Sequence, residues 1–190
     1  MGYKPPSLGG CMAKSDSFFI RQTLNCDNTT TPAGFQQVEM DLGAYVSALG
    51  KSVLRCHNIA VAITDSAGRS PDLFAGGSGG EAKNAAANFQ LTTQTQGDIV
   101  VASNKAVVAS GLVNATNLDN SDGVASIVSE SFDNLPQLWT NGYLIATESI
   151  YLGGSASGGF KDDVYISVTL ECTVETMSQA AAMALSLSQQ

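Results

Sequence analysis

The stretch that decides the fold runs from Asp163 to Glu175 and reads Asp-Val-Tyr-Ile-Ser-Val-Thr-Leu-Glu-Cys-Thr-Val-Glu. An apolar residue occupies every second position, and the positions between them hold Asp, Tyr, Ser, Thr or Glu. Because successive side chains of a β-strand point to opposite faces, this pattern predicts a strand with one buried and one solvated face. It is the clearest periodic signal in the chain.

Other runs rich in Val, Ile, Phe and Thr, bounded by turn residues, predict further strands. They cover residues 17–26, 35–42, 53–64, 88–96 and 99–112, with one or two more strands between 135 and 152. Ser103-Asn104-Lys105 is expected to form a tight hairpin, and residues 124–134 are ambiguous. About eight strands without a long helical pattern predict an all-β domain, an antiparallel sandwich or barrel, over residues 17–176.

The two ends of the chain differ from this middle part. Residues 1–16 contain Pro5 and Pro6 and predict an extended N-terminal arm. Residues 177–190 change to strong helix formers and predict a short C-terminal helix or tail. Its apolar positions at helical spacing are Met177, Ala181, Ala184 and Leu185. Periodicity does not decide whether this segment docks on a neighbouring subunit or covers the edge of its own domain.

Two glycine-rich stretches, residues 76–80 and 153–159, predict flexible loops because glycine leaves the backbone unrestrained. Neither stretch has the Lys-Ser or Lys-Thr ending, or the strand-to-helix context, of a phosphate-binding loop. The sequence therefore indicates no nucleotide site.

Charged residues are scarce, at 14% of the 190 residues against a typical value of about 25%. Gly, Ser, Thr, Asn and Ala replace them. This predicts a neutral surface of small side chains that loses little free energy when a partner removes water from it. The net charge is -8, and no stretch gathers Lys and Arg into a basic patch. This composition argues against direct binding to the phosphates of a nucleic acid.

The N-terminus lacks the apolar run of a signal peptide. No later segment reaches the roughly 18 consecutive apolar residues that a membrane-spanning helix needs. We therefore expect a soluble chain that is made in the cytoplasm and has no transmembrane segment.

The four cysteines are Cys11, Cys26, Cys56 and Cys172, and no two of them form a Cys-x-x-Cys pair. Buried free thiols are the favoured interpretation, since free cysteine packs as a small hydrophobe. A bridge from Cys172 to Cys26 or to Cys56 stays open for a protein that matures outside a reducing cytosol.

Residues for catalysis are few. His57 is the only histidine and lies inside an apolar run, which favours a structural role. Cys56 is its neighbour, and neighbours on a strand point to opposite faces, so the two form no dyad. Residues 119–123, Asp-Asn-Ser-Asp-Gly, resemble part of a calcium loop but lack its bidentate Glu. We predict no enzyme activity, no cofactor and no metal site.

An N-terminal arm, a sandwich pattern, glycine-rich loops, a surface poor in charge and an alanine-rich tail together resemble the single jelly-roll major capsid proteins of small icosahedral viruses. The resemblance implies a jelly-roll sandwich that forms a shell, terminal arms that extend along neighbouring subunits, and loops at residues 76–80 and 153–159 on the surface or at symmetry axes. The partners would be copies of the chain and other structural proteins, within a virion. The implied assembly contacts are Pro5, Pro6, Met177, Met183, Leu185 and Leu187. The missing basic arm departs from this pattern and argues against direct genome packaging by this chain.

Two alternatives are kept open. A carbohydrate-binding or adhesive β-sandwich would use Trp139, Tyr143 and Tyr151 as a stacking platform for sugar rings. A subunit of a helical filament or tube would use the same uncharged surface in open, head-to-tail contacts.

Overall fold

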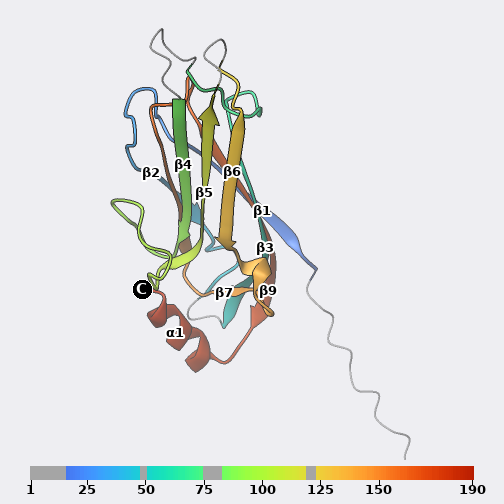
Figure 1. Ribbon diagram of the computed structural model, residues 1–190. Helices are drawn as coiled ribbons and strands as arrows, with labels where there is room; N and C mark the ends of the chain where they lie inside the picture. Colours follow the sequence, from blue (N-terminus) through green and yellow to red (C-terminus); the bar gives the residue numbers. More distant parts are fainter. Residues whose placement is uncertain (1–15, 48–50, 75–82, 119–122) are drawn as a thin grey trace, which may run out of the picture.

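The computed structural model describes residues 16–47, 51–74, 83–118 and 123–190 and shows an elongated β-sandwich (Figure 1). The N-terminal arm with Pro5 and Pro6, Cys11, the glycine-rich loop at 76–80 and residues 119–122 lie outside the described residues. The strands are β1 (Phe18–Asn25), β2 (Gln36–Asp41), β3 (Ser52–Thr64), β4 (Lys83–Thr92), β5 (Val107–Asn117), β6 (Ile127–Asn134), β7 (Tyr143–Ile145), β8 (Ser149–Ala156) and β9 (Tyr165–Thr176). A 3-10 turn, η1 (Pro136–Leu138), and a helix, α1 (Gln179–Ser188), complete the fold.

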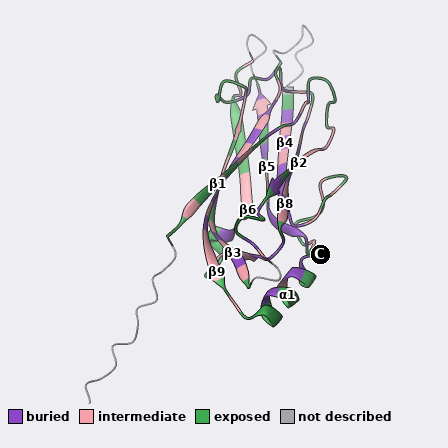
Figure 2. Ribbon diagram, turned by 180° about the vertical axis from the view of Figure 1, so that it is seen from behind, coloured by how far each residue is buried: buried purple, intermediate pink, exposed green. Residues whose placement is uncertain are grey.

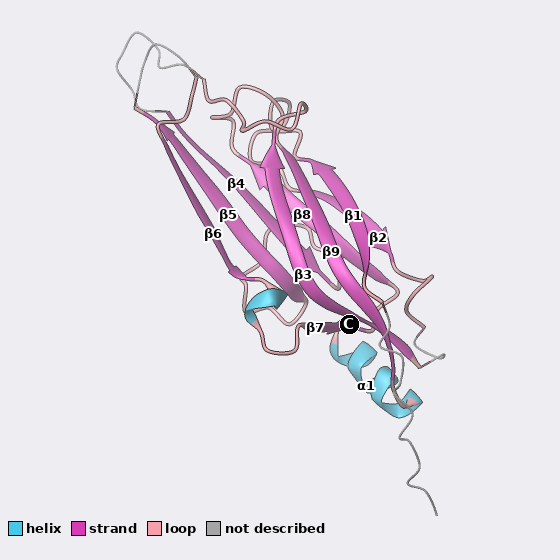
Figure 3. Ribbon diagram, turned by 90° about the vertical axis from the view of Figure 1, so that its right-hand side faces the viewer, coloured by secondary structure: helices cyan, strands magenta, loops and turns pink. Residues whose placement is uncertain are grey.

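The strands form two antiparallel sheets that face each other (Figure 3). The first sheet has the order β1-β9-β3-β7, and the second has the order β2-β8-β4-β5-β6. The first half of the chain pairs with the second half in reverse order, β1 with β9, β2 with β8 and β3 with β7. This is the pairing of a long hairpin rolled into a double sheet, so the expected jelly-roll sandwich is confirmed. The described residues hold nine strands, because β6 extends the second sheet beyond β5.

The core lies between the two sheets, and β9 supplies its central row (Figure 2). Ile166, Val168 and Leu170 are buried and alternate with half-buried polar residues, as the sequence pattern predicted. Large side chains from the second sheet, such as Phe89 and Leu152, meet this row from the opposite side. Each fully buried side chain of this size contributes about 1.5–3 kcal/mol of hydrophobic stabilisation.

The prediction of a flexible loop at residues 153–159 was wrong for its first part. Gly153 and Gly154 are buried inside β8. A Cβ atom on Gly153 would lie 2.6 Å from the ring of Phe35, and one on Gly154 would lie 2.4 Å from Cδ1 of Ile166. Glycine is needed here for close packing, because any side chain would displace a neighbour.

Residues 93–106 also differ from the prediction, which placed strands at 88–96 and 99–112 and a hairpin at Ser103–Lys105. The structure has a connection there, and β5 begins only at Val107. The side chain of Gln90, which is buried, holds this connection against the second sheet. Its Nε2 donates to the carbonyl of Asp98 at 3.2 Å, and its Oε1 accepts from the amide of Val100 at 3.0 Å.

Helix α1 packs on the edge of its own domain through one of its faces. Ser178 caps its first turn by accepting from the amide of Ala181. The buried helical residues are Ala182 and Ser186, and Ala182 packs in a small cluster with Val53 and Ala146. The predicted apolar face was therefore partly wrong. Met177 and Leu185 do pack against this cluster, but Ala181 and Ala184 are exposed, because the helix turns the face with Ala182 and Ser186 toward the domain.

Gln189, directly after α1, fastens the helix to the sandwich. Its side chain is buried and accepts from the amide of Ala146 at 2.9 Å. It also donates to the carbonyl of Leu144 at 2.6 Å and to the hydroxyl of Tyr143 at 3.3 Å. The hydroxyl of Thr93 in turn donates to the carbonyl of Gln189 at 2.6 Å. One polar residue thus joins the end of the chain to both sheets.

Replacing Gln189 with alanine should lower the free energy of unfolding by about 2 kcal/mol, because it leaves a buried amide and a carbonyl without partners. Urea titration followed by circular dichroism measures this loss. Gln190→Ala is the matched control, since the side chain of Gln190 is exposed and should tolerate truncation. Equal midpoints for the two variants would show that Gln189 does not anchor the helix.

Candidate assembly surfaces

Over β4, β5, β6 and the end of β8, the outer face of the second sheet is built from small, uncharged side chains. The edge formed by β2 differs, because it carries the exposed Glu39 and Asp41. In the registers of β4, β5 and β6, Ala86 lies opposite Asn114, and Asn114 lies opposite Ser129. Residues paired in this way share a face, as do those two positions away along each strand. The face comprises Asn84, Ala86, Asn88, Ser110, Leu112, Asn114, Thr116, Ile127, Ser129, Ser131, Ser155 and Ser157. We call these residues the neutral face, because none of them is charged.

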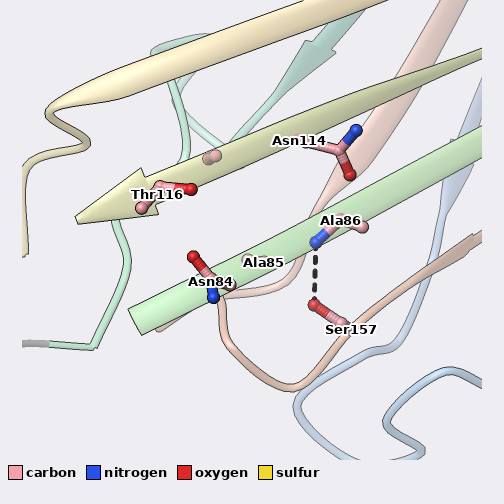
Figure 4. Close-up of a pocket in the computed structure, with 7 residues that line it drawn as sticks. Asn84, Ala85, Ala86, Asn114, Thr116 and Ser157 are labelled. Carbon is pink, nitrogen blue, oxygen red and sulfur yellow. Dashed lines mark hydrogen bonds between the residues drawn. The ribbon is translucent and has the colours of Figure 1, made fainter. Parts of the chain in front are cut away.

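The neutral face is shallowly hollowed in two places. One depression of ≈ 340 Å³ lies over β4 and β5 and is lined by Asn84, Ala86, Asn114, Thr116 and Ser157, among others (Figure 4). The hydroxyl of Ser157 accepts from the amide of Ala86 at 2.9 Å and ties the end of β8 to β4. A second depression of ≈ 280 Å³ lies beside Leu112, against the connection at residues 99–102. Larger side chains of a partner can fill such hollows.

The outer face of the first sheet is different, because it carries charges of both signs. Arg21 and Glu171 lie there on β1 and β9, and Arg55 and Glu175 form an ion pair between β3 and β9. The guanidinium of Arg55 binds both carboxylate oxygens of Glu175, with Nη2 at 2.8 Å from Oε2. Its Nη1 also donates to the carbonyl of Asn141 at 2.5 Å. The hydrogen bond from Arg55 holds the pKa of Glu175 below its usual value.

His57 lies in the same region, on a β-bulge between Cys56 and Asn58. Its Nε2 is 2.9 Å from the hydroxyl of Thr173, and the ring is half-buried. Cys56 is buried in the core, so the two side chains lie on opposite faces of the sheet. Across residues 16–47, 51–74, 83–118 and 123–190, no three His, Cys, Asp or Glu side chains gather in a way that could hold a metal ion.

The three aromatic residues considered for sugar stacking are not brought together. Trp139 and Tyr143 form a tilted pair with ring centroids 5.7 Å apart, whereas Tyr151 belongs to β8 in the other sheet. Several polar side chains near Trp139 are already bonded within the chain. Gln137, for example, donates to the carbonyl of Ile59 at 3.0 Å and accepts from its amide at 3.1 Å. Gln137 therefore has little free hydrogen-bonding capacity for a sugar.

The assembly contacts predicted on the C-terminal segment occupy two different environments. Met177 and Leu185 pack against their own domain. Met183 and Leu187 point away from it, with 43% and 68% of their surface exposed. An apolar region that the sequence did not indicate lies on the edge strand β6, where Ile127 and Val128 are exposed. The mixed pattern of residues 124–134 hid it, because an edge strand exposes side chains on both of its faces.

Among the described residues, no helix is long and apolar enough to cross a membrane.

Comparison with known proteins gives only remote likenesses. No family model matches the chain. No curated protein matches it. Among solved structures, a chain from desmodium yellow mottle tymovirus matches with 10% identity over 95% of this chain and 98% of that chain, at a TM-score of 0.33. VP1 from an unassembled pentamer of Merkel cell polyomavirus matches with 9% identity over 84% and 96%, at a TM-score of 0.38. Similarity at this level carries no functional argument for this chain.

Glu175→Gln should lower stability at pH 7 by less than about 1 kcal/mol, since the ion pair with Arg55 is partly exposed to solvent. The folded-state pKa of Glu175 is lowered, so its stabilisation is present above the unfolded pKa of about 4.3 and is lost as the pH falls through the folded value. The difference in stability between the Glu175→Gln variant and the parent protein should therefore vanish in strong acid. Urea midpoints measured from pH 7 to pH 2 test this.

Glu171→Gln is the control for this series, because Glu171 lies on the same face of β9 but forms no ion pair with another described residue. Its pH profile should stay close to that of the parent protein. A Glu175→Gln profile that runs parallel to the parent's down to pH 2 would contradict the role given to the ion pair.

Proposed function

We propose that this chain is a structural subunit that assembles with copies of itself into a closed shell, as the coat of a virus does. The observation that carries the proposal is the neutral face, an uncharged surface over β4, β5, β6 and the end of β8 on a chain whose net charge is -8. The jelly-roll pairing of the strands supports the same function, because this architecture serves as a building block of viral capsids.

The charge distribution explains why copies of the chain would meet through the neutral face. Two copies that each carry a net charge of -8 repel each other, and every charge buried between them adds a desolvation penalty. A contact through the neutral face avoids that penalty. Its Asn, Ser and Thr side chains can also exchange hydrogen bonds with water for hydrogen bonds across the interface.

A closed shell requires each subunit to contact more than one neighbour, and therefore to use more than one surface. The exposed Met183 and Leu187 on α1 offer a second contact. Val128, which lies on the opposite face of β6 from the neutral face, offers a third. Pro5 and Pro6 in the N-terminal arm, together with Met177 and Leu185, remain proposed contacts.

The other parts of the proposal follow from the same chemistry. The partners are copies of the chain and other structural proteins, and the location is the virion after synthesis in the host cytoplasm. The acidic composition supports a coat that does not bind its genome directly. The proposal includes no enzymatic step.

Light scattering of the purified protein, followed by negative-stain electron microscopy of the heaviest fraction, tests the proposal. Closed shells are the expected result. Regular tubes would show that the subunit forms a filament and not a shell. A monomer at every concentration and salt level would overturn the proposal of self-assembly.

Asn114→Lys should raise the concentration needed for assembly by tenfold or more, because an unpaired charge buried in an interface costs at least about 1.4 kcal/mol. Asn114 is exposed at the centre of the neutral face, so the substitution should leave the fold intact. Thr169→Lys, on the outer face of the first sheet, is the matched control and should assemble like the parent protein. Equal assembly of the two variants would show that the neutral face is not an interface.

A further inference from the structure

The register between β3 and β9 places Cys56 directly opposite Cys172. Both side chains are fully buried and face the core. Directly opposite residues of an antiparallel pair have Cα atoms about 4.5–5.5 Å apart, and disulfides need a separation of about 4.4–6.8 Å. The backbone therefore holds the two cysteines at bridging distance without any rearrangement of the sheet.

The side chains also lie close to each other. The thiol of Cys56 is within hydrogen-bonding reach of Cys172, and this contact together with burial raises the pKa of Cys172. The same thiol is 3.6 Å from the carbonyl of Asn58, just beyond the bulge at His57. The two sulfur atoms thus share one small space in the core.

Cys26 cannot replace Cys56 in such a bridge. Its amide donates to the carbonyl of Val164 at 2.9 Å, which places it just before the start of β9. Cys172 lies eight residues farther along the chain, roughly 27 Å away at about 3.4 Å per residue. This separation is far beyond the limit of about 7 Å between Cα atoms for a disulfide.

We propose that Cys56 and Cys172 form a cross-strand disulfide when the protein folds under oxidising conditions. The two thiols give up two protons and two electrons and form one sulfur–sulfur bond. A low-molecular-weight disulfide such as oxidised glutathione accepts them and leaves as two thiols. The proposal rests on the fold and does not depend on self-assembly.

The bond forms while the chain folds, before the sheet closes. Exchange requires a thiolate, and the raised pKa of Cys172 leaves almost none in the folded protein. Both sulfurs are also shielded from an oxidant in solution once the core is packed. After closure, the same burial protects the disulfide from small reductants.

The disulfide would join a strand of the first half of the chain to the last strand. It closes a long loop, and restricting such a loop in the unfolded chain stabilises the folded state. For a domain of this size, the expected rise in Tm is on the order of 5–15 °C.

The test is to refold the full chain in glutathione buffer, once oxidising and once reducing, and then to alkylate the remaining thiols under denaturing conditions. Proteolysis and mass spectrometry should find a linked peptide with Cys56 and Cys172 only after oxidising refolding, with Cys26 alkylated in both samples. The oxidised protein should show the higher Tm.

Cys56→Ala and Cys172→Ala should each remove the linked peptide and the dependence of Tm on redox conditions, whereas Cys26→Ala should keep both. If an alanine variant does not fold, the peptide maps of the parent protein still show whether Cys56 and Cys172 are linked. The proposal is overturned if Cys56 and Cys172 are both alkylated after oxidising refolding to the native circular dichroism spectrum. It is overturned equally if either residue is linked to Cys11 or Cys26.

Discussion

The pairing of β9 with both β1 and β3 is the constraint on which the rest of the sandwich depends. β9 is the last strand of the chain, and its two neighbours come from the first third. The chain must therefore turn back along its own path, which brings β2 beside β8 and β3 beside β7. The alternating apolar residues of β9 then fix which face of the first sheet points inward, because a shift by one residue would turn all of them toward water.

This dependence explains which strands the sequence could predict. β9 and β2 have one buried and one solvated face, so their alternation is visible in the residues themselves. The edge strand β6 exposes residues on both faces, and its sequence shows no period. Ile99 and Val100 have the composition of a strand, but the side chain of Gln90 holds them in a connection. The sequence cannot indicate that contact, because it depends on how the connection folds back over the sheet.

The same limit on prediction from the sequence applies to single glycine and glutamine residues. Gly153 and Gly154 have the composition of a loop, yet they lie in β8 because Phe35 and Ile166 occupy the space beside them. Gln189 has the composition of a polar tail, yet it is buried because Ala146 and Leu144 present an unpaired amide and carbonyl to it. In each case, the deciding partner is more than ten residues away in the sequence. The overall class of fold, by contrast, depends on local patterns and was predicted.

The sequence predicted the chemical character of the candidate surfaces but not where they lie on the fold. The scarcity of charge indicated a neutral surface, but strand pairing was needed to show that the uncharged residues gather on one side, on β4, β5, β6 and β8. The charged pairs lie on the opposite face, where Arg55 and Glu175 bind each other. The β2 edge of the second sheet carries charge as well, on Glu39 and Asp41, so charged surface borders the neutral face. In the proposed assembly, copies that meet through their neutral faces would keep these charged surfaces in water, so electrostatic repulsion would favour this orientation over others.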